Sequence, residues 1–181
     1  MSESHDQARA ATRAAADRWV AGREVLRAAD PRMAALVEAD PGLDPDHLLE
    51  AWPRDLWGAL VLQVIGQQLS RAKTVYLHDL AARLEDGRLD LERLRILDDD
   101  AARTELTQVK GVGRFTADGV LMLALRRPDV WPAADLALRR AAERVWQLDS
   151  PASIAQIDAL GERFRPWRTL AATYLYRTLA A

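Results

Sequence analysis

Two glycines one residue apart, Gly111 and Gly113, stand between two stretches of helical periodicity, one ending near Gln108 and the next starting near Arg114. Glycine can adopt a positive φ and lets the backbone approach another group closely. The first amides of a helix point outward with the positive end of the helix dipole, so such a turn can hold a phosphate. Lys110 adds a second cation beside Arg114. The pattern predicts a phosphate-binding hairpin, although a Gly-x-Gly sequence by itself is most often only a turn between helices.

A carboxylate follows this hairpin after roughly one further helix. Asp135 stands directly before a helical run that begins at Leu136. Aspartate is common at such a place because its side chain caps the free amides of the helix. A carboxylate near a phosphate-binding hairpin can also stabilise positive charge that develops during a reaction. The two roles are compatible, and the combination is typical of a DNA-repair active site.

The composition is that of a globular protein without cysteine chemistry. The 181 residues are 49% hydrophobic and 29% charged, which is ordinary for a folded domain with its own core. The absence of cysteine excludes disulfides, a thiolate nucleophile and cysteine-ligated zinc or iron–sulfur sites. The three histidines, at positions 5, 47 and 78, lack metal-ligand spacing, so no catalytic transition metal is expected. No apolar run approaches a membrane span and residues 1–16 are polar, so we expect a cytoplasmic, nucleoid-associated protein.

Charge is distributed unevenly along a chain whose formal net charge is −2. Residues 103–140 carry seven Lys and Arg against four Asp and Glu, whereas residues 85–100 carry three against seven. A local basic face on a nearly neutral body is typical of a protein that contacts a short stretch of duplex. On charge alone, solvated helix faces are the simpler interpretation.

Helical periodicity dominates the chain, and apolar residues recur at helical spacing over 56–65 and 120–125. Three pairs in which a capping side chain precedes a proline predict helix starts: Asp30-Pro31, Asp44-Pro45 and Ser150-Pro151. We therefore predict an all-α, compact two-layer helical domain with the active site in the cleft between the layers. Its parts would be N-terminal helices over 1–45 packed on the C-terminal layer, a helical subdomain over 46–100, and a hairpin and catalytic subdomain over 101–181.

Three segments together resemble one family. They are Val64-Ile65-Gly66-Gln67-Gln68-Leu69-Ser70, the hairpin with the following helix through Asp135, and Phe164-Arg165-Pro166-Trp167-Arg168. Their order and spacing resemble the helix-hairpin-helix DNA glycosylases, most closely the 3-methyladenine DNA glycosylase II branch. The resemblance implies base excision repair by hydrolysis of the N-glycosidic bond of alkylated bases such as 3-methyladenine and 7-methylguanine. It also implies a monomer that binds damaged double-stranded DNA and flips the target base out of the stack.

The resemblance assigns roles to several side chains. Asp135 matches the family's catalytic aspartate, which would stabilise the cationic sugar and orient water. Phe115 stands where members that also cut the backbone carry a lysine for a Schiff base, so a monofunctional enzyme is expected. Phe115 and Tyr176 match aromatic positions of the base pocket and Trp131 is a further candidate, with core packing as the alternative for each. Gly119, where relatives can carry tyrosine, is expected to widen the pocket.

The resemblance also implies contacts with the duplex. The turn formed by Gln67, Gln68, Leu69 and Ser70 would fill the space left by the flipped base, and for Gln67 a buried amide bonded to loop backbone is an equal alternative. The expected hairpin contacts are Lys110, Gly111, Val112, Gly113, Arg114 and Thr116. In the family, hairpin carbonyls hold a monovalent cation, and the matching carbonyls here belong to Thr107, Val109 and Val112. A structural Na+ or K+ at the hairpin is thus the one bound ion considered, and no cofactor is expected.

Two other interpretations stay open. A DNA-binding module could retain the hairpin without the chemistry, and the presence of Asp135 argues against this. A glycosylase for another lesion class, such as mismatched or oxidised bases, would use the same fold. Lesion preference depends on the shape of the pocket, which the sequence does not give.

Overall fold

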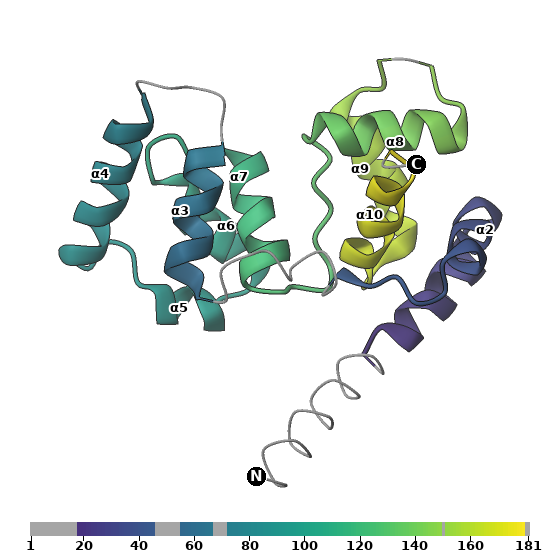
Figure 1. The fold of residues 1–181 in the computed structure, drawn as a ribbon, viewed down its shortest axis with the longest axis horizontal. Coiled ribbons are helices and arrows are strands. Elements are labelled where there is room, and N and C mark those ends of the chain that lie inside the picture. Colours follow the sequence, from purple (N-terminus) through teal and green to yellow (C-terminus); the bar gives the residue numbers. More distant parts are fainter. Residues whose placement is uncertain (1–17, 46–54, 67–71, 150, 180–181) are drawn as a thin grey trace, which may run out of the picture.

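The computed structural model describes residues 18–45, 55–66, 72–149 and 151–179. The regular elements among these residues are all helical, which confirms the all-α prediction. The helices form two layers, and residues 125–135 run from one layer to the other (Figure 1). None of the described helices is both long and apolar enough to cross a membrane.

The first layer consists of α3 (Leu56–Gly66), α4 (Ala72–Glu85), α5 (Leu91–Ile96), α6 (Asp99–Thr107) and α7 (Arg114–Gly119). Helix α7 continues directly into a π-helical turn, η2 (Val120–Ala124). Helix α3 packs against α4, α7 and η2, while α6 packs against α5, α7 and η2. The hydrophobic core of this layer includes Leu60, Leu106 and Leu121, which are fully buried.

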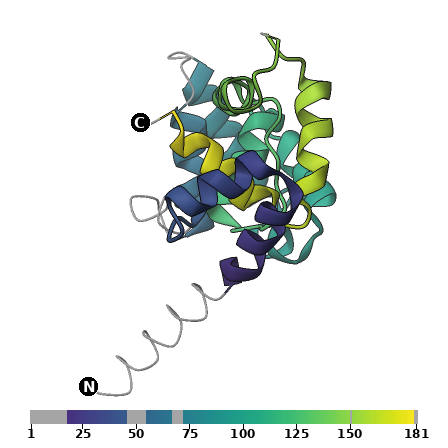
Figure 2. The same cartoon turned by 90° about the vertical axis from the view of Figure 1, so that its right-hand side faces the viewer.

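The second layer consists of α2 (Pro31–Ala39), α8 (Leu136–Trp146), α9 (Ile154–Gly161), the short 3-10 turn η3 (Glu162–Phe164) and α10 (Arg168–Arg177). Helix α10 is central in this layer because it packs against both α8 and α2 (Figure 2). Its residues 169–175 are all buried. A further helix over residues 18–29 precedes α2, and its Trp19 ring meets the Trp167 ring edge-on at a centroid distance of 5.7 Å.

One of the helix starts predicted from the sequence is confirmed by the structure, and another is wrong. Asp30 caps α2, because its Oδ1 accepts hydrogen bonds from the amides of Arg32 and Met33 at 2.8 and 3.4 Å. The predicted start at residues 150–151 is wrong, since α9 begins at Ile154 and is capped by Ser153. Ser153 and Gln156 bond reciprocally in a capping box, which satisfies two free donors at once.

The structure places the boundary between the layers later in the chain than residue 101. Helices α6 and α7 pack against each other and against η2, and η2 packs against α3. The helix-hairpin-helix segment therefore belongs to the layer of α3–α5, and the boundary falls within residues 125–135. Helix α2 belongs to the other layer, where it packs on α10.

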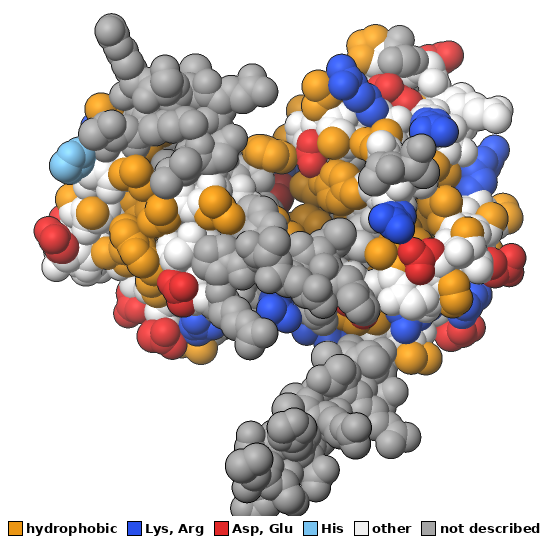
Figure 3. Space-filling model, in the orientation of Figure 1, with side chains coloured by type: hydrophobic (Ala, Val, Ile, Leu, Met, Phe, Trp, Pro, Cys, Tyr) orange, Lys and Arg blue, Asp and Glu red, His pale blue; other side chains and the backbone are white. Residues whose placement is uncertain are grey.

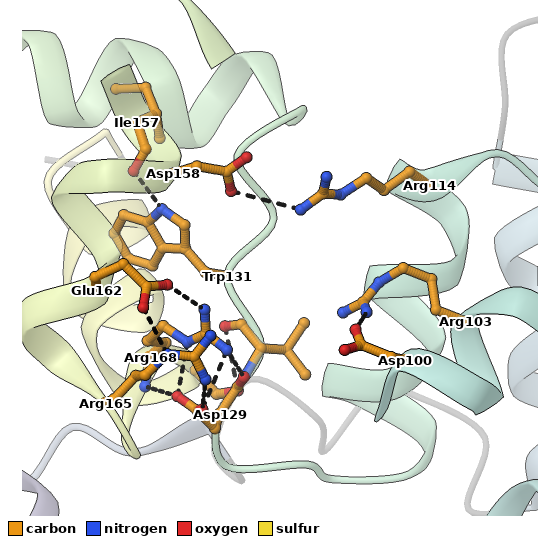
Figure 4. A network of polar contacts seen from close by, with 12 residues as sticks. Asp100, Arg103, Arg114, Asp129, Trp131, Ile157, Asp158, Glu162, Arg165 and Arg168 are labelled. Atoms are coloured by element: carbon orange, nitrogen blue, oxygen red, sulfur yellow. Dashed lines mark hydrogen bonds and ion pairs between the residues drawn. The ribbon is translucent and has the colours of Figure 1, made fainter. Parts of the chain in front are cut away.

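Polar contacts fix the segment that joins the layers. Asp129 accepts hydrogen bonds from Arg165 Nη1 and Arg168 Nε, each at 2.7 Å (Figure 4). The Val130 amide donates to Thr169 Oγ1 at 3.0 Å. These bonds hold the segment against the start of α10 and so determine where α8, with Asp135 at its first turn, begins.

Candidate active site

The predicted phosphate-binding hairpin connects α6 to α7 and is held in shape by α4. Gly111 has a φ of +80°, and a Cβ on it would lie 2.2 Å from Cδ2 of Tyr76. Both its conformation and its contact with the Tyr76 ring therefore require glycine. Asp79 accepts a hydrogen bond from the Lys110 amide at 2.8 Å. This bond, with a second from Arg83, holds the pKa of the Asp79 carboxyl below its usual value.

Gly113 differs from Gly111, because nothing in the described residues requires a glycine there. Its φ of −88° and ψ of 179° are open to any residue, and no atom lies within 4 Å of the position of a Cβ. It precedes α7 and offers no side-chain cap to the first amides of the helix. The side chains of Arg114 and Phe115 beside it are about half exposed. This bare stretch of backbone can be approached closely by a ligand with hydrogen-bond acceptors, such as a phosphate.

Arg114 joins the hairpin to the second layer (Figure 4). Its Nη2 lies 3.5 Å from Asp158 Oδ1 of α9, and its Nε lies 3.7 Å from Asp118 Oδ2. Asp118 is fully buried and accepts a hydrogen bond from Arg103 at 2.8 Å. Burial raises the pKa of the Asp118 carboxyl, and the Arg103 bond and charge oppose this. Internal ion pairs thus neutralise part of the basic surplus of residues 103–140.

Both carboxylate oxygens of Asp135 are hydrogen-bonded. Oδ1 accepts from the Ala137 amide at 2.8 Å, which is the bond of a helix cap. Oδ2 accepts from the Tyr176 hydroxyl of α10 at 2.5 Å. Burial and the neighbouring charge of Asp135 raise the pKa of Tyr176 far above its usual value. Asp135 as a residue is partly exposed, so its role as a cap does not bury it completely.

The three aromatic candidates lie in different surroundings. Phe115 is 49% exposed on the first turn of α7, and Tyr176 is partly buried beside the start of α8. Trp131 is 3% exposed, donates its indole N–H to the Ile157 carbonyl at 2.7 Å and packs against Phe164. These contacts of Trp131 are those of a core residue, the alternative considered for it above.

Two features of α7 differ from expectation. A Cβ on Gly119 would lie 2.4 Å from Nε2 of Gln63, so the Gln63 side chain of α3 occupies the space that was expected to widen the base pocket. Thr116 is 3% exposed. Its side chain lies on the buried face of α7 and does not reach the surface expected to contact DNA.

Some of the predicted site cannot be placed. The four residues of the expected space-filling turn, Gln67, Gln68, Leu69 and Ser70, lie outside the described residues. The carbonyls predicted to bind a monovalent cation are those of Thr107, Val109 and Val112. That of Val109 accepts a hydrogen bond from the Val112 amide at 3.0 Å, which leaves it one lone pair. Within the described part of the chain, no group of three or more His, Asp or Glu side chains could hold a metal ion. The cation at the hairpin stays a prediction.

Comparison with known proteins gives both sequence relatives and structural neighbours. A Bacillus subtilis protein provisionally named DNA-3-methyladenine glycosylase YfjP is 31% identical over 112 residues, which are 62% of this chain and 39% of that protein. DNA-3-methyladenine glycosylase 1 of Schizosaccharomyces pombe is 38% identical over 73 residues, 40% of this chain and 32% of that protein. The chain thus spans well under half the length of these curated relatives. The solved S. pombe 3-methyladenine DNA glycosylase Mag1, in complex with abasic DNA, superimposes with a TM-score of 0.81 at 22% identity and covers 90% of this chain and 98% of its own.

No protein-family model matches the chain. The sequence relatives and the shared fold nevertheless agree. The chain is similar in sequence to part of these DNA-3-methyladenine glycosylases and shares the fold of the solved S. pombe enzyme. In this chain the helix-hairpin-helix segment is α6, the hairpin with Gly111 and Gly113, and α7.

For several residues around the site, the sequence predicted no role. Asp118 follows Arg114 by four residues, a spacing that predicts an ion pair on a helix. The bond from Tyr176 to Asp135 spans 41 residues, and no local pattern could have shown it. The same holds for Gln63 over Gly119 and for Asp158 beside Arg114.

Proposed function

We propose that this protein is a monofunctional DNA glycosylase that excises alkylated bases, such as 3-methyladenine and 7-methylguanine, from double-stranded DNA. The observation that carries the proposal is the placement of Asp135. This partly exposed residue caps α8, and its carboxylate is held by one hydrogen bond to each oxygen. The relatives whose names include 3-methyladenine DNA glycosylase supply the substrate class.

The chemistry needs a fixed negative charge more than it needs a general acid. As the N-glycosidic bond breaks, the base leaves with the electron pair and positive charge develops on the deoxyribose. Asp135 would stabilise that charge and orient a water molecule, which adds to C1′ and releases a proton. An alkylated purine is already cationic, so it departs without prior protonation. The products are a free base and an abasic site.

The hairpin would hold the DNA backbone while this happens. Gly113 offers bare backbone at the start of α7, and Lys110 and Arg114 supply positive charge beside it. Phosphate contacts of this kind fix the position of the protein on the duplex without reading its sequence. The target base must leave the stack to reach Asp135.

Cleavage of the DNA backbone is not part of the proposed activity. A glycosylase that also cuts the strand needs an amine to attack the sugar, and Phe115 has none. The abasic site would therefore remain with its strand intact. We further propose that the protein acts as a monomer on DNA in the cytoplasm, with a monovalent cation at the hairpin carbonyls and no other cofactor.

A base-release assay over a panel of lesions tests the proposal. Duplexes carrying 7-methylguanine, 3-methyladenine, ethenoadenine, hypoxanthine, uracil or 8-oxoguanine would be incubated with the protein, and the abasic sites would be cleaved with alkali and counted. We expect release of the methylated purines. Binding without release on every duplex would favour the inert DNA-binding module, and release confined to mismatched or oxidised bases would assign another lesion class.

A further inference from the structure

Asp135 is held from two elements that are far apart in the sequence. The Ala137 amide at the start of α8 donates to Oδ1 at 2.8 Å, and the Tyr176 hydroxyl on α10 donates to Oδ2 at 2.5 Å. The second distance is at the short end for a hydrogen bond between a hydroxyl and a carboxylate, a class that is stronger than neutral hydrogen bonds. Without Tyr176, only the cap bond would restrain the carboxylate.

The Tyr176 hydroxyl is suited to act as a permanent donor. Burial, the charge of Asp135 and the more distant charge of Asp118 raise its pKa far above that of a free phenol. The hydroxyl therefore keeps its proton at neutral pH and can donate to Asp135. The residues that precede it on α10, Tyr174 and Leu175, are fully buried, so the helix that carries the hydroxyl is firmly anchored in the core.

We propose that Tyr176 is a positioning residue that fixes the orientation of the Asp135 carboxylate for attack on the sugar. This inference rests on the proposed glycosylase function. A carboxylate has about four acceptor positions, of which the two bonds occupy one on each oxygen. The remaining lone pairs are directed away from Ala137 and Tyr176 and are free to face the sugar cation and the attacking water.

The Tyr176 hydroxyl affects the Asp135 carboxylate in two opposite ways, through its charge and through its orientation, and the effect on orientation is the larger. A donated hydrogen bond disperses some of the carboxylate charge, which weakens its attraction for the cation. Loss of orientation costs more, because a displacement of about 1 Å in a reacting group can slow a reaction about 100-fold. We therefore expect Tyr176→Phe to slow base release, although the ring and its packing are retained.

Tyr174→Phe is the matched control. Tyr174 lies two residues earlier on α10, is also buried, and donates its hydroxyl to the Asp40 carbonyl at 2.9 Å. Each variant removes one tyrosine hydroxyl from the same helix, but only Tyr176→Phe removes a hydrogen bond from Asp135. A loss of activity caused merely by a weakened helix would appear in both variants.

The experiment measures single-turnover release of 7-methylguanine and, separately, the Kd for a duplex with a tetrahydrofuran abasic analogue. Tyr176→Phe should lower the rate constant about tenfold or more with less than about a twofold change in Kd, while Tyr174→Phe leaves both near the parent values. An unchanged rate for Tyr176→Phe, or equal losses in the two variants, would overturn the proposal.

Carbon-13 NMR of labelled tyrosine Cζ atoms tests the contact without substrate. The chain has three tyrosines, and the two phenylalanine variants assign their signals. Asp135→Asn should move the Tyr176 signal and leave that of Tyr174 in place, and an unmoved Tyr176 signal would refute the contact. If the parent released no base from any duplex, the glycosylase function and the positioning role of Tyr176 would both be refuted, whereas the NMR result would still report on the hydrogen bond.

Discussion

The two hairpin glycines should respond differently to the same substitution. Gly111→Ala places a Cβ at φ +80° and 2.2 Å from the Tyr76 ring. The backbone conformation costs about 1–2 kcal/mol for a residue with a side chain, and forcing a methyl group against a packed ring costs about 1–3 kcal/mol. We therefore expect the free energy of unfolding to fall by about 2–5 kcal/mol, measured by urea denaturation followed by circular dichroism.

Gly113→Ala is the control for this substitution. Its backbone is extended and its Cβ would meet nothing within 4 Å, so the only cost is that of a poorer helix cap, at most about 1 kcal/mol. Its effect should appear in DNA binding, because a methyl group stands where a phosphate would approach. Titration at matched salt should show weaker binding to damaged and undamaged duplex alike.

Either of two results would refute these two expectations. A Gly111→Ala protein as stable as the parent would mean that the contact with Tyr76 does not fix the hairpin. A folded Gly113→Ala protein with parental affinity for both duplexes would mean that the hairpin backbone does not contact DNA.

Two further predictions concern stability and product chemistry. Asp30→Ala removes the cap of α2, which costs about 1 kcal/mol. It also leaves the buried indole N–H of Trp146 without its acceptor at 2.9 Å, which costs about 1–3 kcal/mol. Urea denaturation should therefore show a free energy of unfolding lower by about 2–4 kcal/mol. Burial acts to raise the pKa of the Asp30 carboxyl, but hydrogen bonds from Trp146 and from two α2 amides, with the charge of Arg163, hold this pKa below its usual value. The ionised Asp30 therefore stabilises the fold above the pKa that it has in the unfolded chain, and this stabilisation is lost as the pH falls through the lower pKa of the folded protein. Asp30→Asn should abolish this acid dependence. Because Phe115 replaces a Schiff-base lysine, borohydride during turnover should trap no protein–DNA adduct, and efficient trapping would implicate one of the two lysines of the chain, Lys73 or Lys110.

Local sequence patterns predicted what local physics decides. The cap at Asp30 and the glycine hairpin between two helices depend on residues within a few positions of one another, and the structure shows both. The predicted helix start after Ser150 failed because a capping box three residues later satisfies the helix amides better.

Features that depend on contacts between distant segments could not be predicted from the sequence. The layer boundary near residue 101 was misplaced because the packing of η2 on α3 joins residues about 60 positions apart, and periodicity does not reveal which apolar faces meet. Gly119 was read as open space, whereas the side chain that covers it comes from Gln63 on another helix. The same limit applies to Tyr176: its aromatic ring led to the prediction of a base-pocket residue, and the bond from its hydroxyl to Asp135 could not be predicted.

The charge of Asp135 is central to the proposed chemistry. Asparagine is as good a helix cap as aspartate, so Asp135→Asn should keep α8 folded while it removes the negative charge and replaces one of the two acceptor oxygens with an NH2 group. Single-turnover release of 7-methylguanine from a duplex should fall by about 100-fold or more, with the Kd for the same duplex nearly unchanged. Release by the variant at a rate close to that of the parent protein would contradict the central claim.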